Sequence, residues 1–169
     1  MEFLKYHTFW RRFLAVIIDV ILLKPLEWVD TYILSGVIDS FGIMAWGVFY
    51  SIIGIAYYVF MHYKYGQTVG KMITKIKVID VSEERLLSVF QACLRDIVPI
   101  LFFPLSIYIY YLLAFSGLDY PAILVENPWM FYIGFVVFIW ISLEFATMFL
   151  NEKRRAIHDL IAGSVVIKT

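Results

Sequence analysis

Two acidic residues stand inside apolar stretches of this sequence. Asp19 interrupts the apolar run 13–23, and Glu144 is the one charged residue in the run 129–150. A carboxyl group inside a membrane is costly unless it is paired or hydrated, so such residues are by default candidates for binding protons or cations. Asp19 and Glu144 are therefore the predicted ion- or proton-binding residues.

The two carboxyl groups are expected at one depth in the membrane. Asp19 follows Arg12 by seven residues, which is a rise of about 10 Å along a helix and places Arg12 at the inner membrane surface. Glu144 precedes Leu150, the inner end of its run, by six residues, or about 9 Å. If the two groups share a pocket, a proton or a cation is held between the like charges.

The alternative is a purely structural role. Buried ionic networks can serve only to fix how helices are aligned. In that case the Asp19 and Glu144 side chains are bonded to Arg95, to backbone amides, or to Tyr57 and Tyr58.

The composition indicates that the surrounding elements lie in a membrane. The sequence is 62% hydrophobic and 17% charged, whereas a soluble domain is roughly 45 to 50% apolar. A chain of 169 residues cannot hide that much apolar surface in one core. Lys+Arg 14 balances Asp+Glu 14, so no net charge attracts nucleic acid. The lipid bilayer is the predicted partner, and no nucleic acid is expected.

The sequence lacks the signatures of membrane enzymes, with neither H-E-x-x-H nor G-x-S-x-G. His7, His62 and His158 are expected on one side of the membrane, but their separations do not match those of metal ligands. We expect no enzyme activity, no cofactor and no metal site.

Four apolar runs predict four transmembrane helices. The runs 41–61, 97–115 and 129–150 match the length of about 20 residues that a span needs. Pro99 and Pro104 predict a kinked or partly re-entrant third span. The run 13–23 is short, and we expect it to continue as an interfacial helix through 28–34. The predicted fold class is an all-α polytopic membrane protein with a single domain, 1–169.

The basic residues predict the orientation. Every Lys and Arg except Lys24 lies before the first run, between the second and third, or after the fourth. Because positively charged loops stay in the cytoplasm, both termini and the long middle loop are expected there, in a multi-pass protein of the cell (inner) membrane.

The cytoplasmic segments carry their own structural signals. Polar and apolar residues alternate over 74–80, and a second candidate strand covers 164–168. Two short strands are best explained by pairing with each other, which predicts a small two-stranded cytoplasmic sheet. Residues 88–96 are expected to form an interfacial helix capped by Ser82 or Ser88.

Three motifs in order give the chain a family resemblance. They are R-F-L-A-V-I-I-D at 12–19, G-Q-T-V-G-K at 66–71 and R-A-I-H-D-L-I-A-G-S at 155–164. With them the sequence resembles the RDD family of membrane proteins, which is named for one Arg and two Asp residues that match Arg12, Asp19 and Asp159. Val69 stands where Pro is common in that family, and Ser164 where Thr is common.

The resemblance implies a role in transport, and some members of the family are linked to sodium/proton antiport. It also adds Asp159 to the site. Since the tail must return to the inner membrane surface, we predict a salt bridge between Arg12 and Asp159. Arg12, Asp159 and Arg95 are expected to form a gating or structural salt bridge.

The first functional hypothesis is a small cation/proton transporter that exchanges Na⁺ or another monovalent cation for H⁺. Four helices leave little room for a central path, so a homo-oligomer is expected. The alternative is a non-transporting membrane scaffold that binds a partner protein or lipid through its basic cytoplasmic face.

Overall fold

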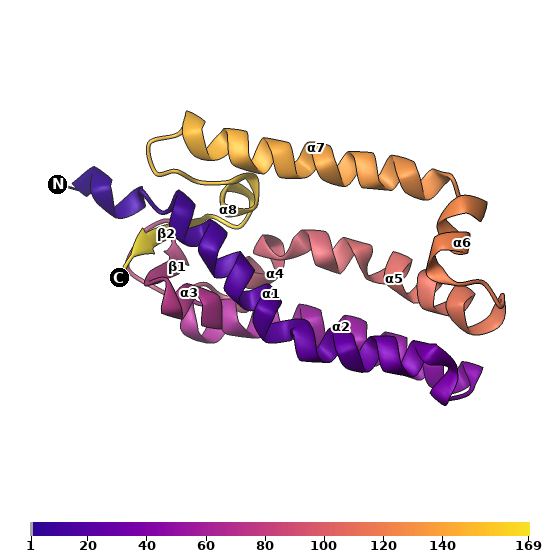
Figure 1. The fold of residues 1–169 in the computed structure, drawn as a ribbon. Helices are drawn as coiled ribbons and strands as arrows, with labels where there is room; N and C mark the ends of the chain where they lie inside the picture. The colour runs from indigo at the N-terminus through magenta and orange to yellow at the C-terminus, as the bar shows by residue number, and fades with distance from the viewer. Residues whose placement is uncertain (1) are drawn as a thin grey trace.

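The computed structural model describes residues 2–169, and it is mostly helical with one small sheet. Four long helices run between the two ends of the molecule (Figure 1): α1 (Phe9–Tyr32), α2 (Ser40–Tyr65), α5 (Ile97–Phe115) and α7 (Trp129–Leu150). The short elements at the end where both termini lie form one layer, which we call the cytoplasmic layer after the side of the membrane that the sequence predicts for it: η1 (Glu2–Tyr6), α3 (Val69–Ile73), β1 (Ile76–Asp80), α4 (Val89–Arg95), α8 (Ile157–Ile161) and β2 (Ser164–Lys168). The helix α6 (Tyr120–Glu126) closes the opposite end.

Three of the long helices, α2, α5 and α7, are long and apolar enough to cross a membrane. The helix α1 is not among them, because it carries Asp19, Lys24, Glu27 and Asp30. As expected, the helix continues beyond the run 13–23. It passes through Pro25 to Tyr32, and a π-helical turn, Ile33–Val37, follows it.

Hydrogen bonds join α1 to its neighbours toward the end of the molecule opposite the termini. One carboxyl oxygen of Asp30 accepts from Trp46 Nε1 of α2 at 2.8 Å and from the Tyr110 hydroxyl of α5 at 2.5 Å. A polar group away from water must be hydrogen-bonded to be tolerated. The α1 helix is thus held against α2 and α5 by a contact that also satisfies its acidic side chain.

The third apolar run forms one continuous helix, α5, rather than a re-entrant segment. Pro99 lies in its first turn, where the missing N–H has no intrahelical partner in any case. Pro104 lies inside the helix. The helix packs on α2 through Gly47, where an added Cβ would overlap the Tyr110 ring.

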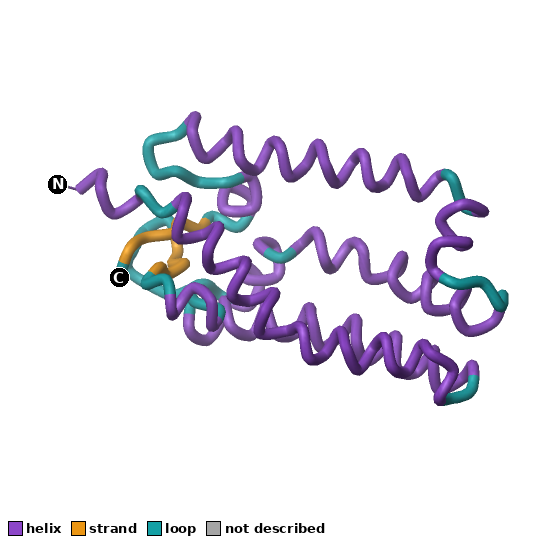
Figure 2. The backbone as a smooth tube through the Cα atoms, viewed as in Figure 1, coloured by secondary structure: helices purple, strands orange, loops and turns teal. Residues whose placement is uncertain are grey.

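The predicted two-stranded sheet is confirmed. The strands β1 and β2 pair antiparallel, with Val78 opposite Val166, as the pairing of 74–80 with 164–168 requires. Figure 2 shows them together at the end of the molecule where the chain terminates. One face of the sheet packs with Leu87 and with Ala15 of α1. The sheet therefore joins the middle loop and the tail to the first helix.

The helix α4 begins as predicted at Ser88 rather than Ser82. Ser88 Oγ accepts from the Gln91 amide at 3.2 Å, and the Gln91 side chain accepts from the Ser88 amide at 3.1 Å. This reciprocal capping box satisfies two amides at the start of the helix. It thereby stabilises α4, which ends at Arg95.

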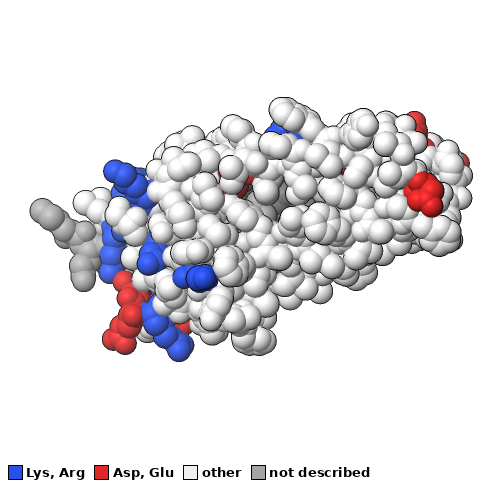
Figure 3. Space-filling view, turned by 90° about the horizontal axis from the view of Figure 1, so that it is seen from below, with Lys and Arg blue, Asp and Glu red and all other residues white. Residues whose placement is uncertain are grey.

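Charge is segregated along the molecule. In Figure 3 most Lys and Arg side chains gather at the cytoplasmic layer, and the flanks of the long helices on this face are almost uncharged. Many large apolar side chains of α7 are exposed, among them Phe131, Phe138 and Phe149. Such a surface suits lipid chains rather than water.

Replacement of Gly47 by Ala tests the contact between α2 and α5. The added methyl group overlaps the Tyr110 ring, so we expect the variant to lose about 1–3 kcal/mol of stability. Gly54→Ala is the matched control in the same helix, because its Cβ meets no atom within 4 Å. Thermal unfolding of both variants in one detergent measures the difference, and equal melting temperatures would contradict the packing described here.

Candidate functional site

The buried carboxylate of Asp159 is the centre of the cytoplasmic layer. Its side chain is inaccessible to solvent, and Oδ2 lies 2.6 Å from Arg12 Nη1. Its other oxygen, Oδ1, pairs with Arg95 Nη1. The predicted salt bridge between Arg12 and Asp159 is confirmed, and Arg95 joins it. Three elements, α1, α4 and α8, therefore meet at one carboxylate.

Further contacts make this ion-pair centre rigid. Arg12 donates to the backbone oxygen of Arg154 at 3.0 Å, and Arg95 donates to Ser164 Oγ at 2.8 Å. Burial alone would raise the pKa of Asp159, but Arg95 and Arg12 hold it well below its usual range. Asp159 is therefore a permanent anion between two cations.

Asp19 lies in a different environment. Its side chain is 3% exposed and accepts hydrogen bonds from Thr68 Oγ1 at 2.6 Å, the Gly70 amide at 2.8 Å and the Tyr57 hydroxyl at 3.1 Å. A Cβ at Gly70 would overlap the Ala15 backbone oxygen. The G-Q-T-V-G-K motif thus provides the close approach and the donors that fasten α3 to α1.

Glu144 is bound by the tail instead. Its Oε1 accepts from the His158 amide at 3.2 Å, and Oε2 lies 2.7 Å from His158 Nδ1. The second contact is an ion-pair distance without hydrogen-bond geometry, so Oε2 has no hydrogen-bond donor. Of the two carboxyl groups, that of Glu144 therefore has fewer hydrogen-bond donors than that of Asp19.

The expectation that Asp19 and Glu144 share a pocket is wrong. Glu144 lines the cavity between α1 and α7, whereas Asp19 is enclosed by α3 and does not reach it. Asp19 bonds to Tyr57 and a backbone amide, as the structural alternative expected. Arg95 bonds to Asp159, Ser164 and His158. An ion-binding role for either carboxyl group stays a prediction.

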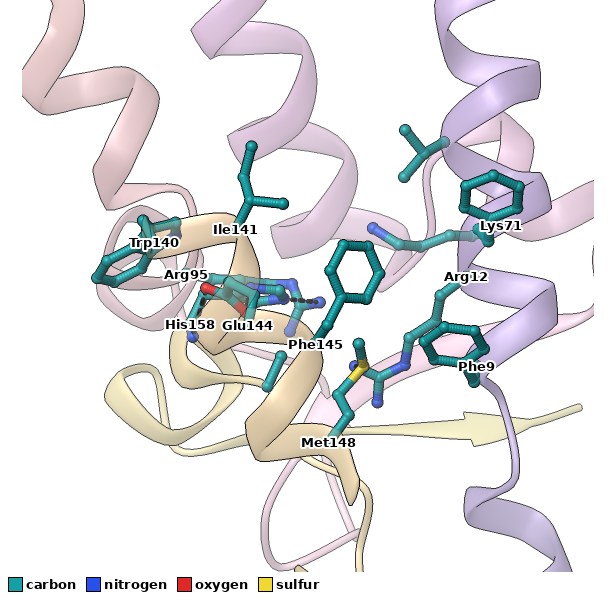
Figure 4. A pocket seen from close by; sticks show the side chains of 13 residues that line it. Phe9, Arg12, Lys71, Arg95, Trp140, Ile141, Glu144, Phe145, Met148 and His158 are labelled. Atoms are coloured by element: carbon teal, nitrogen blue, oxygen red, sulfur yellow. Dashed lines mark hydrogen bonds and ion pairs between the residues drawn. The ribbon is translucent and has the colours of Figure 1, made fainter. Parts of the chain in front are cut away.

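The cavity has a volume of about 380 Å³ and lies between α1 and α7 (Figure 4). Aromatic and aliphatic side chains form its walls: Phe9, Phe13 and Val16 of α1, and Trp140, Ile141, Phe145 and Met148 of α7. Ionisable side chains also line the cavity: Arg12, Lys71, Arg95, Glu144 and His158. A mostly apolar cavity with a few convergent polar groups is the usual form of a binding site.

Lys71 and His158 line the cavity although neither was predicted as a site residue, since His158 was considered only as a metal ligand. Lys71 extends toward the cavity (Figure 4), and its Nζ lies 2.6 Å from His62 Nε2. Burial, together with the charge of Arg95, lowers the pKa of Lys71 to about 7. Both residues stand in motifs already recognised, Lys71 directly after Gly70 and His158 directly before Asp159. Their positions in the motifs were the available signal.

The arrangement offers acid–base chemistry rather than metal binding. Glu144 and His158 form an acid–base pair from separate elements, and His62 Nδ1 lies 2.7 Å from Asp96 Oδ2 in a second pair. In the part of the chain that the structure describes, no three His, Cys, Asp or Glu side chains converge as metal ligands would.

The comparisons with known proteins agree with the motifs. The model of the RDD family matches residues 6–163, so the resemblance drawn from the sequence is confirmed. Neither the curated proteins nor the solved structures contain a significant match to the chain.

Asp19→Asn tests whether Asp19 fastens α3 to α1. The amide group replaces one acceptor oxygen by a donor, which opposes the donors from Thr68 and Gly70. We expect faster hydrogen exchange in residues 69–73 and a loss of about 1–3 kcal/mol of stability. Asp39→Asn is the control, since that exposed carboxylate only caps α2. Unchanged protection of residues 69–73 would refute the anchoring role.

Proposed function

The chain belongs to the RDD family of membrane proteins, and on this premise we propose that it is a proton-coupled transporter of the cell (inner) membrane. The observation that supports the proposal is the pair of Glu144 and His158 in the wall of a mostly apolar cavity. The proposed exchange is of H⁺ for Na⁺ or another monovalent cation.

The pair has the properties of a proton site. The Glu144 side chain is 13% exposed and that of His158 is 30% exposed, so a proton can reach the histidine from the cytoplasmic layer. Protonation of His158 would complete the ion pair with Glu144, and its loss would leave the carboxylate free to attract a cation.

The sequence predicted that Asp19 and Glu144 together bind a proton or a cation, and the structure favours Glu144 alone of the two. The Asp19 carboxylate already accepts three hydrogen bonds and lies outside the cavity. We therefore assign proton binding to Glu144 with His158, and we assign Asp19 to the structure. Arg12, Arg95 and Asp159 position His158 in this scheme.

In the proposed topology α1 also crosses the membrane, which brings the number of spans to four. Its 24 residues give a length of about 36 Å, which exceeds the hydrocarbon thickness of about 30 Å. Two of its acidic side chains, Asp19 and Asp30, are bonded to α2, α3 and α5 instead of facing lipid. Both termini and the basic residues then lie on the cytoplasmic side. A homo-oligomer would cover the open side of the cavity.

A specific observation also favours the scaffold alternative. The basic cytoplasmic layer in Figure 3 would attract an acidic partner protein or an anionic membrane surface without any transport. A measurement of proton movement separates the two functions.

Glu144→Gln is the test of the proton site. In vesicles with an imposed Na⁺ or K⁺ gradient, the wild-type protein should move protons, which a dye inside the vesicle reports. Because glutamine keeps the shape but cannot bind the proton, we expect at least about a tenfold lower rate, in the range of general acid–base effects. Glu152→Gln, an exposed carboxyl group just beyond α7, should retain the wild-type rate.

Two results would overturn the proposal. One is the absence of proton movement in wild-type vesicles with Na⁺, K⁺ and Li⁺ in turn, which favours the scaffold. The other is an undiminished rate in Glu144→Gln, which would show that this pair is not the proton site.

A further inference from the structure

The cavity between α1 and α7 contains a cation that proton transfer between Glu144 and His158 does not use. The Lys71 side chain extends into it from α3 (Figure 4). Its Nζ makes one polar contact, at 2.6 Å from Nε2 of His62, which carries no negative charge to balance it. Among the described residues, no carboxylate oxygen lies within 4.0 Å of this ammonium group. A lysine ammonium has three N–H donors, so two remain without an acceptor.

The neighbouring carboxylates are already occupied by other donors. Asp159 is held by two arginines, Asp96 by His62, Asp19 by α3 and Glu144 by His158. The arginines are occupied as well, because both pair with Asp159. Lys71 is therefore the cation that lacks a counterion, and a partly buried charge without one is costly. An anion is the ligand that would remove this penalty.

The rest of the cavity restricts the kind of anion. Phe13 and Val16 line it on the α1 side, and Ile141 and Phe145 line it on the α7 side. These walls continue into the exposed apolar flanks of α1 and α7, and α7 is long and apolar enough to cross a membrane. A free inorganic anion gains nothing from such walls, whereas an acyl chain gains about 0.8 kcal/mol for each buried CH₂ group.

We propose that this cavity binds one anionic phospholipid of the inner leaflet, with its phosphate on Lys71 Nζ and an acyl chain between α1 and α7. Lys71 lies in the cytoplasmic layer, just beyond the inner end of α2, at the level where lipid phosphates meet the protein. The site does not depend on proton transport, since a scaffold could hold the same lipid.

Lipid binding at this site should weaken as the pH rises. Burial and Arg95 lower the pKa of Lys71 to about 7, and Asp96, Asp19 and Asp159 act in the opposite direction. The ammonium form is therefore present at pH 6 and largely lost at pH 8.5 in the empty cavity. The other ionisable groups that face Lys71 or line the cavity are His62, Arg12, Glu144 and His158.

Native mass spectrometry of the detergent-solubilised protein tests the proposal. Phosphatidylglycerol and phosphatidylcholine are titrated separately, and the protein with one bound lipid is counted. We expect phosphatidylglycerol to bind more tightly at pH 6 than at pH 8.5. Lys71→Gln should weaken it at least about tenfold, in keeping with the loss of one charge-assisted contact.

Two further variants serve as controls. Lys71→Arg keeps the charge and should retain most of the binding, which separates a charge effect from a folding defect. Lys64→Gln removes an exposed lysine at the end of α2 and should bind as the wild type does. Ile141→Trp narrows the cavity between the helices and should weaken lipid binding while leaving Lys71 in place.

Several outcomes would overturn the lipid site. Equal weakening in Lys64→Gln and Lys71→Gln would indicate general surface attraction. Equal affinity for the two lipids would show that the net charge is not recognised. Competition by millimolar inorganic phosphate as effective as that by the lipid would identify a soluble anion as the ligand. Because none of these measurements uses ion movement, failure of the transport proposal leaves them interpretable.

Discussion

The ion pairs of Asp159 with Arg12 and Arg95 join three parts of the chain that lie far apart in sequence. A carboxylate that is inaccessible to water is tolerated only when it is paired and hydrogen-bonded, and both conditions are met here. The tail helix α8 is thereby fixed between α1 and α4. The sheet of β1 and β2 extends the same junction, because β2 follows α8 directly.

The cavity is a consequence of this junction. The helix α7 stands apart from α1 and α5 along much of its length in Figure 1, and it is joined to the others at its ends through α6 and α8. His158, next to Asp159, reaches Glu144 on α7. The position of one buried ion pair thus determines where the acid–base pair lies.

The sequence predicted the elements better than their contacts. Apolar runs and alternation located the long helices and both strands, because periodicity reports which face of an element is buried. The pair of Arg12 and Asp159 followed from a family resemblance and the return of the tail. The shared pocket of Asp19 and Glu144 was wrong because depth along a helix does not give the direction of a side chain around it. Lys71 was missed because one lysine in the short helix α3 gives no periodic signal. Its isolation from carboxylates exists only in three dimensions.

A double-mutant cycle on Arg95 and Asp159 tests the central claim most directly. Asp159→Asn, Arg95→Gln and the double variant are unfolded thermally in the same detergent. If the buried ion pair holds the cytoplasmic layer together, the double variant should lose about 1–3 kcal/mol less than the sum of the two single variants. Additive losses would contradict the account, because they would mean that the two side chains stabilise the protein independently.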